Sequence, residues 1–308
     1  MAPLREMPQP PARLQRAARP LMSNADRCPD LTSDPDVTSG PEVAPRADMP
    51  LDTDLLVSED RYFEAGGRTV ALTGAVLTYL PDLPTSAALV HRIDPSALVA
   101  DPLAWLVAVE RALDDLGITR SRLRLDAPPP QLAIALSLLD YRAERGNGLI
   151  RAAAPLGTDV TLIQIRDATD WERKLELHSA VEREGAGEDP AMVVAVERLK
   201  QEAGHLTLWL ALRDGVPAAA VASAQVGSLL RIRDLTVAPT PRRRGVTAAV
   251  VAAMVRLAHI RGLDGAGLLA EPGSTLEMSC RSKGYPAATT VTTWDRALTP
   301  AAVERRAP

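Results

Sequence analysis

The hydrophobic pattern of the chain is most informative over residues 229–262, where its period changes from that of a strand to that of a helix. Residues 229–237 are mostly apolar and tolerate extended backbone, so they predict a strand. From Val246 onwards apolar residues recur at helical spacing, and Gly262 then occupies the position after a helix that favours left-handed dihedral angles. One face of this predicted helix carries Val250, Ala253, Leu257 and Ile260.

The predicted loop between this strand and helix is basic and ends on a glycine, because Arg242, Arg243 and Arg244 precede Gly245. The first turn of a helix leaves backbone N–H groups unpaired and carries a partial positive charge, and a glycine lets a ligand approach the backbone closely. The arrangement is typical of phosphate binding. A P-loop is excluded because no Gly-Lys-Ser/Thr is present, and a dinucleotide-binding turn would need its glycines earlier. A solvated basic loop before a core helix is the alternative interpretation.

The residues around this loop resemble motif A of the GNAT (GCN5-related N-acetyltransferase) acyltransferases, in which Leu-x-Val precedes Arg-x-x-Gly-x-small. The matching residues are Leu235-Thr236-Val237 and then Arg242-Arg243-Arg244-Gly245-Val246-Thr247. Thr247 departs from the Gly or Ala that the family prefers, and it either crowds the pyrophosphate or donates its hydroxyl to a phosphate. Farther along the chain, Ser282-Lys283-Gly284-Tyr285 resembles the end of the family's motif B.

The hydrophobic pattern of the second half predicts the order of elements found in this family. Thr169 and Glu172 form a predicted capping box, Asp189-Pro190 starts another helix, and Asp214-Gly215 marks a tight hairpin. The predicted strands are 160–167, 206–212, 216–225, 229–237, 266–271 and 288–294, with helices that begin near 169, 189, 246 and 274. The expected fold class is therefore a mixed α/β fold whose largely antiparallel sheet is flanked by helices, the GNAT acyl-CoA N-acyltransferase fold, over about 160–296.

The first half is expected to begin with a disordered tail at 1–54, because that segment holds ten of the 26 prolines and no Phe, Trp or Tyr. Ordered structure is expected from near Arg61. Asp101-Pro102 is predicted to start a helix that turns Leu103, Leu106, Val107, Leu113 and Leu116 inward. The other predicted elements are strands at 61–65, 69–79, 87–93, 122–125 and 141–150 and a helix at 128–139.

Equal spacings indicate an internal duplication. Ile93 to Asp101 spans 8 positions, as does Val237 to Gly245, and Pro102 to Tyr141 spans 39, as does Val246 to Tyr285. The first copy lacks the initial strand and two helices, and carboxylates at Asp94 and Asp101 would repel a pyrophosphate from its loop. The predicted domains are a tail at 1–54, a degenerate GNAT-like half at 55–155 and a GNAT acetyltransferase domain at 156–300. An unrelated small α/β domain at 55–155 is the alternative.

Composition narrows the class of partners. The net charge of −4 and a pI near 5.7 argue against nucleic-acid binding. Cys28 and Cys280 are the only cysteines, which indicates no disulfide framework and a reducing cytoplasm. No apolar run approaches the length of a membrane span, and the four histidines lack metal-ligand spacing, so we expect neither a membrane segment nor a metal.

The GNAT resemblance implies acyl transfer from acetyl-CoA or a related acyl-CoA to a primary amine of a small molecule or peptide. It places the pantetheine against the backbone of Leu235, Thr236 and Val237, with the Val237 N–H polarising the thioester carbonyl. The pyrophosphate would meet the N–H groups of residues 243–248, which end at Ala248. Ser274 occupies a position where the family often has an Asn that touches CoA.

Glu271 and Asp234 are the candidate bases for the attacking amine, and the alternative is that both are solvated at strand ends. Cys280 occupies the position of the Tyr that usually protonates the leaving thiolate, and a small buried residue is the alternative interpretation there. Because of Thr247 and Cys280, a catalytically weak GNAT-fold module that binds CoA or a partner remains the second functional hypothesis. The sequence does not predict the acceptor amine.

Overall fold

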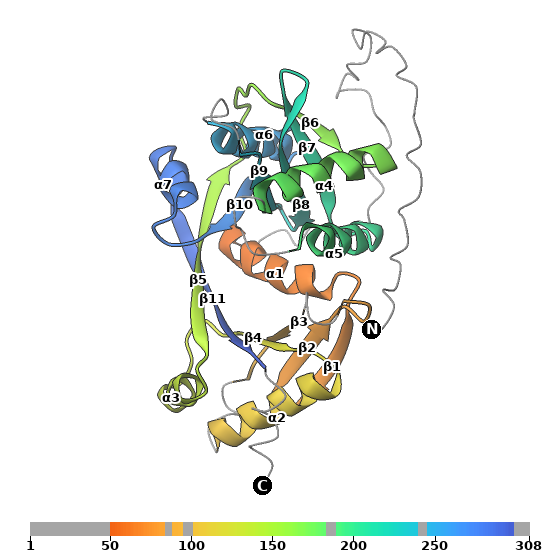
Figure 1. Cartoon of the computed structure of the whole chain (residues 1–308). Coiled ribbons are helices and arrows are strands. Elements are labelled where there is room, and N and C mark those ends of the chain that lie inside the picture. Colours follow the sequence, from red (N-terminus) through yellow and green to blue (C-terminus); the bar gives the residue numbers. More distant parts are fainter. Residues whose placement is uncertain (1–49, 84–87, 95–100, 183–188, 240–244, 299–308) are drawn as a thin grey trace, which may run out of the picture. The chain divides into compact units, whose positions relative to one another are not determined.

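The computed structural model of the chain describes residues 50–83, 88–94, 101–182, 189–239 and 245–298. Within these residues there are seven helices and eleven strands (Figure 1). The helices are α1 (Leu51–Glu64), α2 (Pro102–Asp115), α3 (Pro130–Leu138), α4 (Ala168–Glu182), α5 (Pro190–Glu202), α6 (Val246–Ile260) and α7 (Thr275–Ser282). None of them is long and apolar enough to cross a membrane. The strands are β1 (Arg68–Leu72), β2 (Ala75–Tyr79), β3 (Ala88–His91), β4 (Arg120–Arg124), β5 (Arg142–Ala152), β6 (Thr161–Gln164), β7 (Thr207–Arg213), β8 (Val216–Val226), β9 (Leu229–Val237), β10 (Gly265–Ala270) and β11 (Ala287–Ala297).

The strands form one mixed sheet in the order β1-β2-β3-β4-β11-β5-β10-β9-β8-β7-β6. Its pairs are antiparallel except for β3 with β4 and β9 with β10. The order β3, α2, β4, α3, β5 repeats as β9, α6, β10, α7, β11, and each series contains one of the two parallel pairs. The mixed, largely antiparallel sheet and the repeated order of elements confirm the predicted fold class and its partial first copy.

The two halves of the chain exchange their last strands. β5 ends the first half, yet it lies between β11 and β10 and pairs with β10 from Gly265↔Ala152 to Ala270↔Asn147. β11 ends the second half, yet it lies between β4 and β5. Each half therefore supplies a strand that the other half's portion of the sheet needs. The division into domains at 55–155 and 156–300 stays a prediction.

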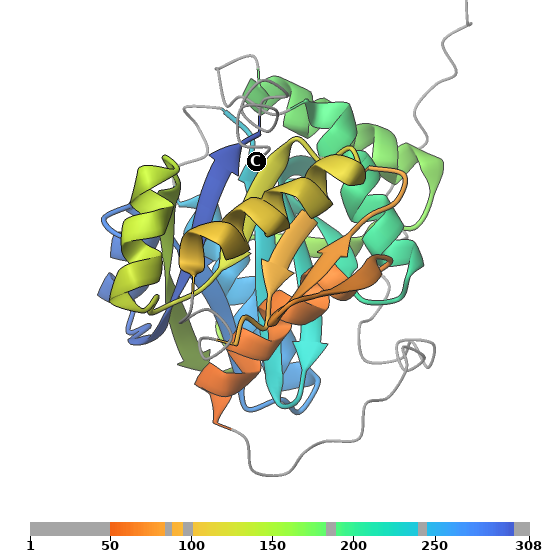
Figure 2. The same ribbon diagram turned by 90° about the horizontal axis from the view of Figure 1, so that it is seen from below.

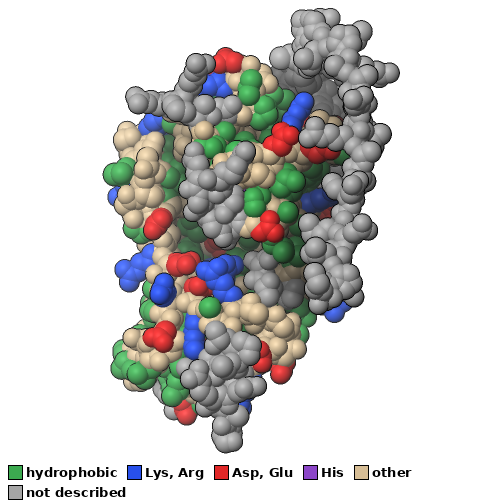
Figure 3. Space-filling view, in the orientation of Figure 1, with side chains coloured by type: hydrophobic (Ala, Val, Ile, Leu, Met, Phe, Trp, Pro, Cys, Tyr) green, Lys and Arg blue, Asp and Glu red, His purple; other side chains and the backbone are tan. Residues whose placement is uncertain are grey.

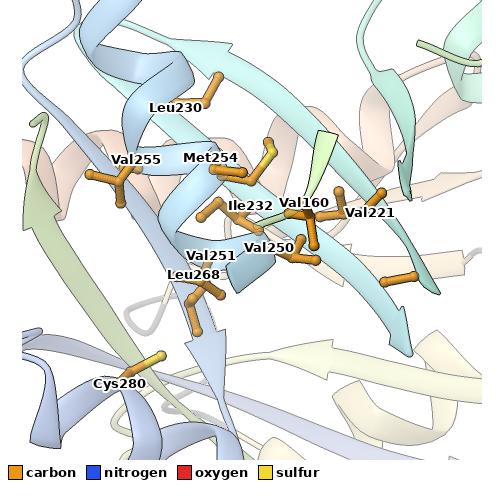
Figure 4. Close-up of a cluster of buried hydrophobic side chains, with 14 of the residues drawn as sticks. Val160, Val221, Leu230, Ile232, Val250, Val251, Met254, Val255, Leu268 and Cys280 are labelled. Carbon is orange, nitrogen blue, oxygen red and sulfur yellow. The ribbon is translucent and has the colours of Figure 1, made fainter. Parts of the chain in front are cut away.

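Helices cover both faces of the sheet. α6 and α7 pack on one face over a core that includes Leu230, Ile232 and Leu268, and Figure 4 shows Val250, Val251, Met254 and Val255 of α6 beside these strand residues. α1, α4 and α5 pack on the other face of the second half. In the first half, α2 lies in front of β1–β3 in the view from below (Figure 2), and its Leu106 belongs to the same buried cluster as Leu77 and Val90.

Ion pairs join the strands where the halves meet. Arg120 and Arg122 of β4 both contact Asp295 of β11, with Arg120 Nε at 2.6 Å from Asp295 Oδ1 and Arg122 Nε at 3.3 Å. Arg124 Nη1 lies 2.6 Å from Asp60 Oδ1 in α1. Acidic and basic side chains are accordingly interspersed on the visible described surface (Figure 3).

Several local features follow the sequence prediction. Asp214 and Gly215 both have positive φ, 54° and 75°, as a tight hairpin turn requires. Asp101 caps α2 by accepting a hydrogen bond from the Ala104 N–H at 2.9 Å, and Asp189 caps α5 in the same manner. Gly262 has a φ of 67° after α6.

The sequence prediction is wrong at 69–79, where β1 and β2 form an antiparallel hairpin instead of one strand, and in the region around Arg61. Residues 61–65 were expected to be a strand after a tail that ended at 54, but α1 runs from Leu51 to Glu64. Its inward face contains three buried polar residues, Asp54, Ser58 and Glu59. Leu55 is the fully buried apolar residue beside them, and polar residues at the neighbouring inward positions interrupt the apolar periodicity, so the hydrophobic pattern did not predict the helix.

Smaller corrections concern caps and helix faces. Asp167, rather than Thr169, caps α4, because its Oδ1 accepts a hydrogen bond from the Asp170 N–H at 2.9 Å. Leu103 and Ile260 were placed inward but are 43% and 53% exposed. In α2 the inward positions belong to Trp105, Val109 and Glu110 as well as to the predicted Leu106 and Leu113.

Candidate functional site

The parallel strands β9 and β10 separate part-way along their length. Their pairing runs from Gly265↔Leu229 to Gly267↔Arg231 and ends there. β9 then continues to Val237 and β10 to Ala270 without pairing to each other. Beyond Arg231 the edge of β9 that faces β10 therefore has no strand partner among the described residues, and extended backbone can bind there.

A bulge at Asp234 marks the same point in β9. Asp234 has a φ of 51°, and the register with β8 shifts between Ala220↔Thr236 and Ala222↔Arg233. Before and after the bulge, Leu230, Ile232, Leu235 and Val237 all pack in the core beneath α6. The extra residue therefore leaves two consecutive side chains, Arg233 and Asp234, for the opposite face.

The backbone after the bulge presents an N–H group to the gap. Ala238 N–H donates to Ala218 O at 2.9 Å, so it points towards β8. Successive N–H groups in a strand point to opposite edges, so the Val237 N–H points towards the gap between β9 and β10. This is the direction that the sequence prediction requires of Val237.

The start of α6 lies after the end of β9 and carries no side-chain cap. Gly245 is the N-cap residue, with a φ of 83°, and no side chain of the cap accepts a hydrogen bond from the helix. Its left-handed conformation is one that glycine adopts without strain. The first turn, which includes Val246, Thr247 and Ala248, therefore offers backbone N–H groups to an anion. Arg242, Arg243 and Arg244 lie outside the described residues.

A cavity of about 370 Å³ lies beside the first two turns of α6. It is bounded by α6, by the C-terminal part of α7 and by the segment that joins the two halves. The lining residues are Arg151, Leu156, Gly157, Thr247, Ala248, Val251, Ala252, Ser279, Cys280, Lys283 and Tyr285. Its volume lies in the range of small-molecule sites.

On the opposite face, charged groups are buried beneath α4 and α5. Lys174 and Lys200 have no exposed surface, and Glu197 is 1% exposed. Lys174 Nζ lies 2.9 Å from Glu197 Oε2, and the two groups form an ion pair. Burial raises the pKa of Glu197 to about 7, and the nearby Lys174 offsets only part of that rise. Asp234 lies near enough to Glu197 to raise its pKa further.

The same cluster includes groups with pKa values lowered by burial. Burial lowers the pKa of His178 to about 4, with the nearby Lys174 as a second cause. Burial and the charge of Arg233 lower the pKa of Lys200 to about 8. Neither His178 Nε2 nor Asp234 Oδ2 has a hydrogen-bond partner among the described residues, and both atoms are buried.

α1, which belongs to the first half of the chain, borders this cluster of buried charges. Glu59 binds Arg231 through Oε1 at 2.7 Å from Nη2, and it also binds Arg233. Burial alone would raise the pKa of Glu59, but Arg233 and Arg231 outweigh it and hold the pKa at about 2. The Arg233 guanidinium lies 3.6 Å from the centre of the Tyr62 ring. The first half therefore forms part of the wall around Asp234.

The buried Glu197 makes stability depend on pH. Its pKa near 7 lies above its ordinary value near 4.5, so the folded chain holds a proton that the unfolded chain releases. The bound proton stabilises the folded chain. This stabilisation is complete below pH 4.5 and is lost as the pH rises through 7. We expect Glu197→Gln to become more stable relative to wild type between pH 5 and 8, by at most about 1.4 kcal/mol per pH unit.

Urea denaturation at a series of pH values measures this difference. Glu202→Gln is the matched control, because Glu202 lies on the same helix but is exposed, with Arg198 as its partner at 2.9 Å. Its curve should run parallel to that of wild type. A parallel curve for Glu197→Gln as well would mean that Glu197 is already ionised in the folded chain throughout this range.

Some of the predicted site residues lie together at β9 and at the cavity, and the others lie elsewhere. Leu235, Thr236 and Val237 line the unpaired part of β9, and Thr247 and Ala248 lie beside the cavity. Cys280 is 4% exposed at the cavity, and burial raises the pKa of its thiol, so the thiol is protonated at neutral pH. The remaining residues are not gathered there: Asp234 is in the buried cluster, Glu271 is exposed after β10, and Ser274 caps α7 by accepting from the Glu277 N–H at 3.2 Å.

The sequence prediction missed the residues that surround Asp234. Glu197 and Lys200 occupy the buried face of α5 beside Val196. Lys174 and His178 lie one turn apart on α4. Charged residues at positions where helical periodicity requires apolar ones were the available indication. No local feature of the sequence marks Arg151 as a site residue, because Arg151 reaches the cavity only through the pairing of β5 with β10.

No family model matches the sequence, and no curated protein matches it. Solved structures do match. A GCN5-related N-acetyltransferase from Kribbella flavida aligns with a TM-score of 0.56 at 18% identity, over 83% of this chain and 99% of that chain. A GCN5-related N-acetyltransferase from Sphaerobacter thermophilus aligns with a TM-score of 0.51 at 16% identity, over 74% and 82%. A functionally unknown conserved protein from Staphylococcus epidermidis aligns with a TM-score of 0.58 at 10% identity, over 76% and 96%.

Identities this low show similarity of fold. The alignments also show how much of the chain shares this fold. Residues 156–308 make up only about half of the chain, whereas each alignment covers 74% or more of the chain. Both halves of the chain therefore take part in the shared fold.

Proposed function

Since the chain has the GNAT fold, we propose that it transfers an acyl group from acetyl-CoA or a related acyl-CoA to a primary amine of a small molecule or peptide. One observation carries the proposal: β9 and β10 separate beside the uncapped start of α6, and the Val237 N–H points into the gap. An extended pantetheine fits beside the unpaired edge of β9, and phosphates fit at the N-terminus of α6.

In this proposal each step is assigned to a residue that the structure describes. The first turn of α6 from Gly245 binds the pyrophosphate. The Val237 N–H donates to the thioester oxygen as negative charge develops there. The amine nitrogen attacks the carbonyl carbon, and the carbon–sulfur bond breaks. Asp234 or Glu271 takes the amine proton. The leaving thiolate is protonated from solvent, because Cys280, the predicted donor, lines the cavity beside α6 and not the gap.

The environment favours Asp234 as the base. Its Oδ2 is buried without a hydrogen-bond partner among the described residues, whereas the Glu271 side chain is exposed. Glu197 lies close enough to Asp234 for their charges to interact, and burial holds its pKa at about 7. A carboxyl group of that pKa near Asp234 can take on the proton that Asp234 receives.

Release of CoA thiol, measured against a panel of primary amines, tests the proposal. We expect at least one amine to support turnover. Asp234→Asn should lower that turnover by about 10²–10⁴-fold, the usual contribution of a general base, while acetyl-CoA binding is retained. Asp214→Asn is the matched control, because Asp214 also has positive φ but is exposed in the β7–β8 hairpin.

Other results would revise the proposal. Turnover that survives Asp234→Asn but is lost in Glu271→Gln would assign the base to Glu271. Binding of acetyl-CoA with no turnover on any amine would favour a CoA-binding module, for which Thr247 and Cys280, which depart from the family's preferred residues, are the supporting observations. Absence of acetyl-CoA binding would contradict the proposal as a whole.

A further inference from the structure

The first half of the chain contributes a cation to the cavity beside α6. Arg151 belongs to β5, the strand that the first half places beside β10. Its Nη1 donates to the backbone oxygen of Lys283 at 2.8 Å, and its guanidinium carbon lies 5.2 Å from the centre of the Tyr285 ring. These contacts hold the side chain against the end of α7, where it lines the cavity.

Lys283 supplies a second cation to the same wall. It follows α7, lines the cavity, and has an exposed side chain. Within the described ranges, neither Arg151 nor Lys283 is ion-paired with a carboxylate. Two positive groups that line one cavity, without an acidic partner among the described residues, form a site for an anion.

The cavity has an apolar part as well as this charged edge. Leu156, Val251 and Ala252 line it. A ligand that fits both parts carries a flat or apolar group and, at one end, a phosphate. The planar guanidinium of Arg151 can bind a phosphate with two parallel N–H donors, and Lys283 adds a point charge.

We propose that Arg151 and Lys283 bind the 3′-phosphate of CoA, with the adenosine in the cavity, so that the first half completes the coenzyme site of the second. This inference rests on the proposed function, because that function makes acyl-CoA the ligand. The N-terminus of α6 binds the pyrophosphate, and the 3′-phosphate is then the remaining anionic group. The exchange of β5 into the sheet beside β10 is what brings Arg151 there.

Calorimetry on the full chain, with CoA and 3′-dephospho-CoA as the two probes, tests the inference. Wild type should bind CoA about tenfold or more tightly than dephospho-CoA, since a charge-assisted bidentate contact is lost with the phosphate. Arg151→Met should weaken CoA by a similar factor and leave dephospho-CoA unchanged. Lys283→Met should give a smaller loss of the same kind.

Arg145→Met is the matched control. Arg145 is an exposed arginine on the same strand and does not line the cavity, so this variant should keep the preference for CoA. Unchanged dephospho-CoA binding by Arg151→Met also shows that this variant is folded and that its pyrophosphate site is intact. The Met side chain keeps the apolar contact with Tyr285.

The other outcomes separate this inference from the proposed function. If wild type binds neither probe, the proposed function fails and the inference fails with it. If wild type binds both probes equally, the inference is overturned while acyl-CoA binding stands. If Arg151→Met weakens both probes equally, Arg151 acts on another part of the coenzyme or on the shape of the cavity, and its assignment to the 3′-phosphate is overturned.

Discussion

Gly245→Asp should weaken acetyl-CoA binding by at least about a hundredfold. Gly245 is the N-cap of α6, and a Cβ added to it would meet no atom of the described residues within 4 Å, so the added side chain has space although the φ of 83° strains it. Its carboxylate would lie at the helix start, where we place the pyrophosphate. Two like charges about 4 Å apart cost about 4 kcal/mol at an effective dielectric constant of about 20, and a hundredfold loss needs about 2.7 kcal/mol.

Gly245→Asn separates this charge effect from backbone strain. The φ of 83° disfavours any side chain, but asparagine tolerates the left-handed region about as well as aspartate does and carries no charge. Calorimetry should show a small loss for Gly245→Asn and a large one for Gly245→Asp. Equal affinities for the two variants, or wild-type affinity in a folded Gly245→Asp chain, would mean that the phosphates bind elsewhere.

The same titration should give one acetyl-CoA per chain. In the first half, the start of α2 is already capped by a carboxylate, because Asp101 Oδ1 accepts from the Ala104 N–H. An anion would have to displace that group, whereas the cap of α6 is a glycine. Residues 95–100 of the corresponding loop lie outside the described residues, so the expected stoichiometry of one is argued from the Asp101 cap. A stoichiometry of two would show that the first half is a working site.

Residues 156–308 expressed alone should not fold into a stable, soluble protein. Without the first half, β10 loses its pairing with β5, and β11 loses both neighbours, β4 and β5. The loss of α1 also removes Glu59 from Arg231, which is 3% exposed. An unpaired strand edge and a buried charge without its partner each favour aggregation or unfolding.

Thermal melting followed by circular dichroism, with size-exclusion chromatography, measures this outcome. A chain that begins at Pro50 is the control: it keeps α1 and should melt cooperatively at the temperature of the full chain. Co-expression of 1–155 with 156–308 should restore a soluble complex, because the missing strands are supplied in trans. A monomeric 156–308 fragment that melts cooperatively would contradict the structural role that we assign to the strand exchange.

Much of the second half could be predicted from sequence because short-range sequence features specify its elements. The change of period after Val237, the glycine at 245 and the positive-φ pair Asp214-Gly215 each act over a few residues. The order of strands and helices follows from such features, and the resemblance to GNAT motif A depends on that order. The unpaired edge at Val237 and the uncapped helix start at Gly245 were therefore predictable as a pair.

The sequence by itself determined most of the strands and helices, where most of them begin, and where a glycine ends the loop before α6, because propensity, capping and glycine dihedral angles are properties of neighbouring residues. Only the tertiary structure decided that β5 and β11 change places, since the local sequence of neither strand specifies its neighbours in the sheet. It also decided that α1 is a helix, because Glu59 is buried against Arg231 at a sequence separation of 172 residues, and no local pattern records that pairing. The cavity with Arg151 and the cluster around Asp234 both follow from these long-range contacts.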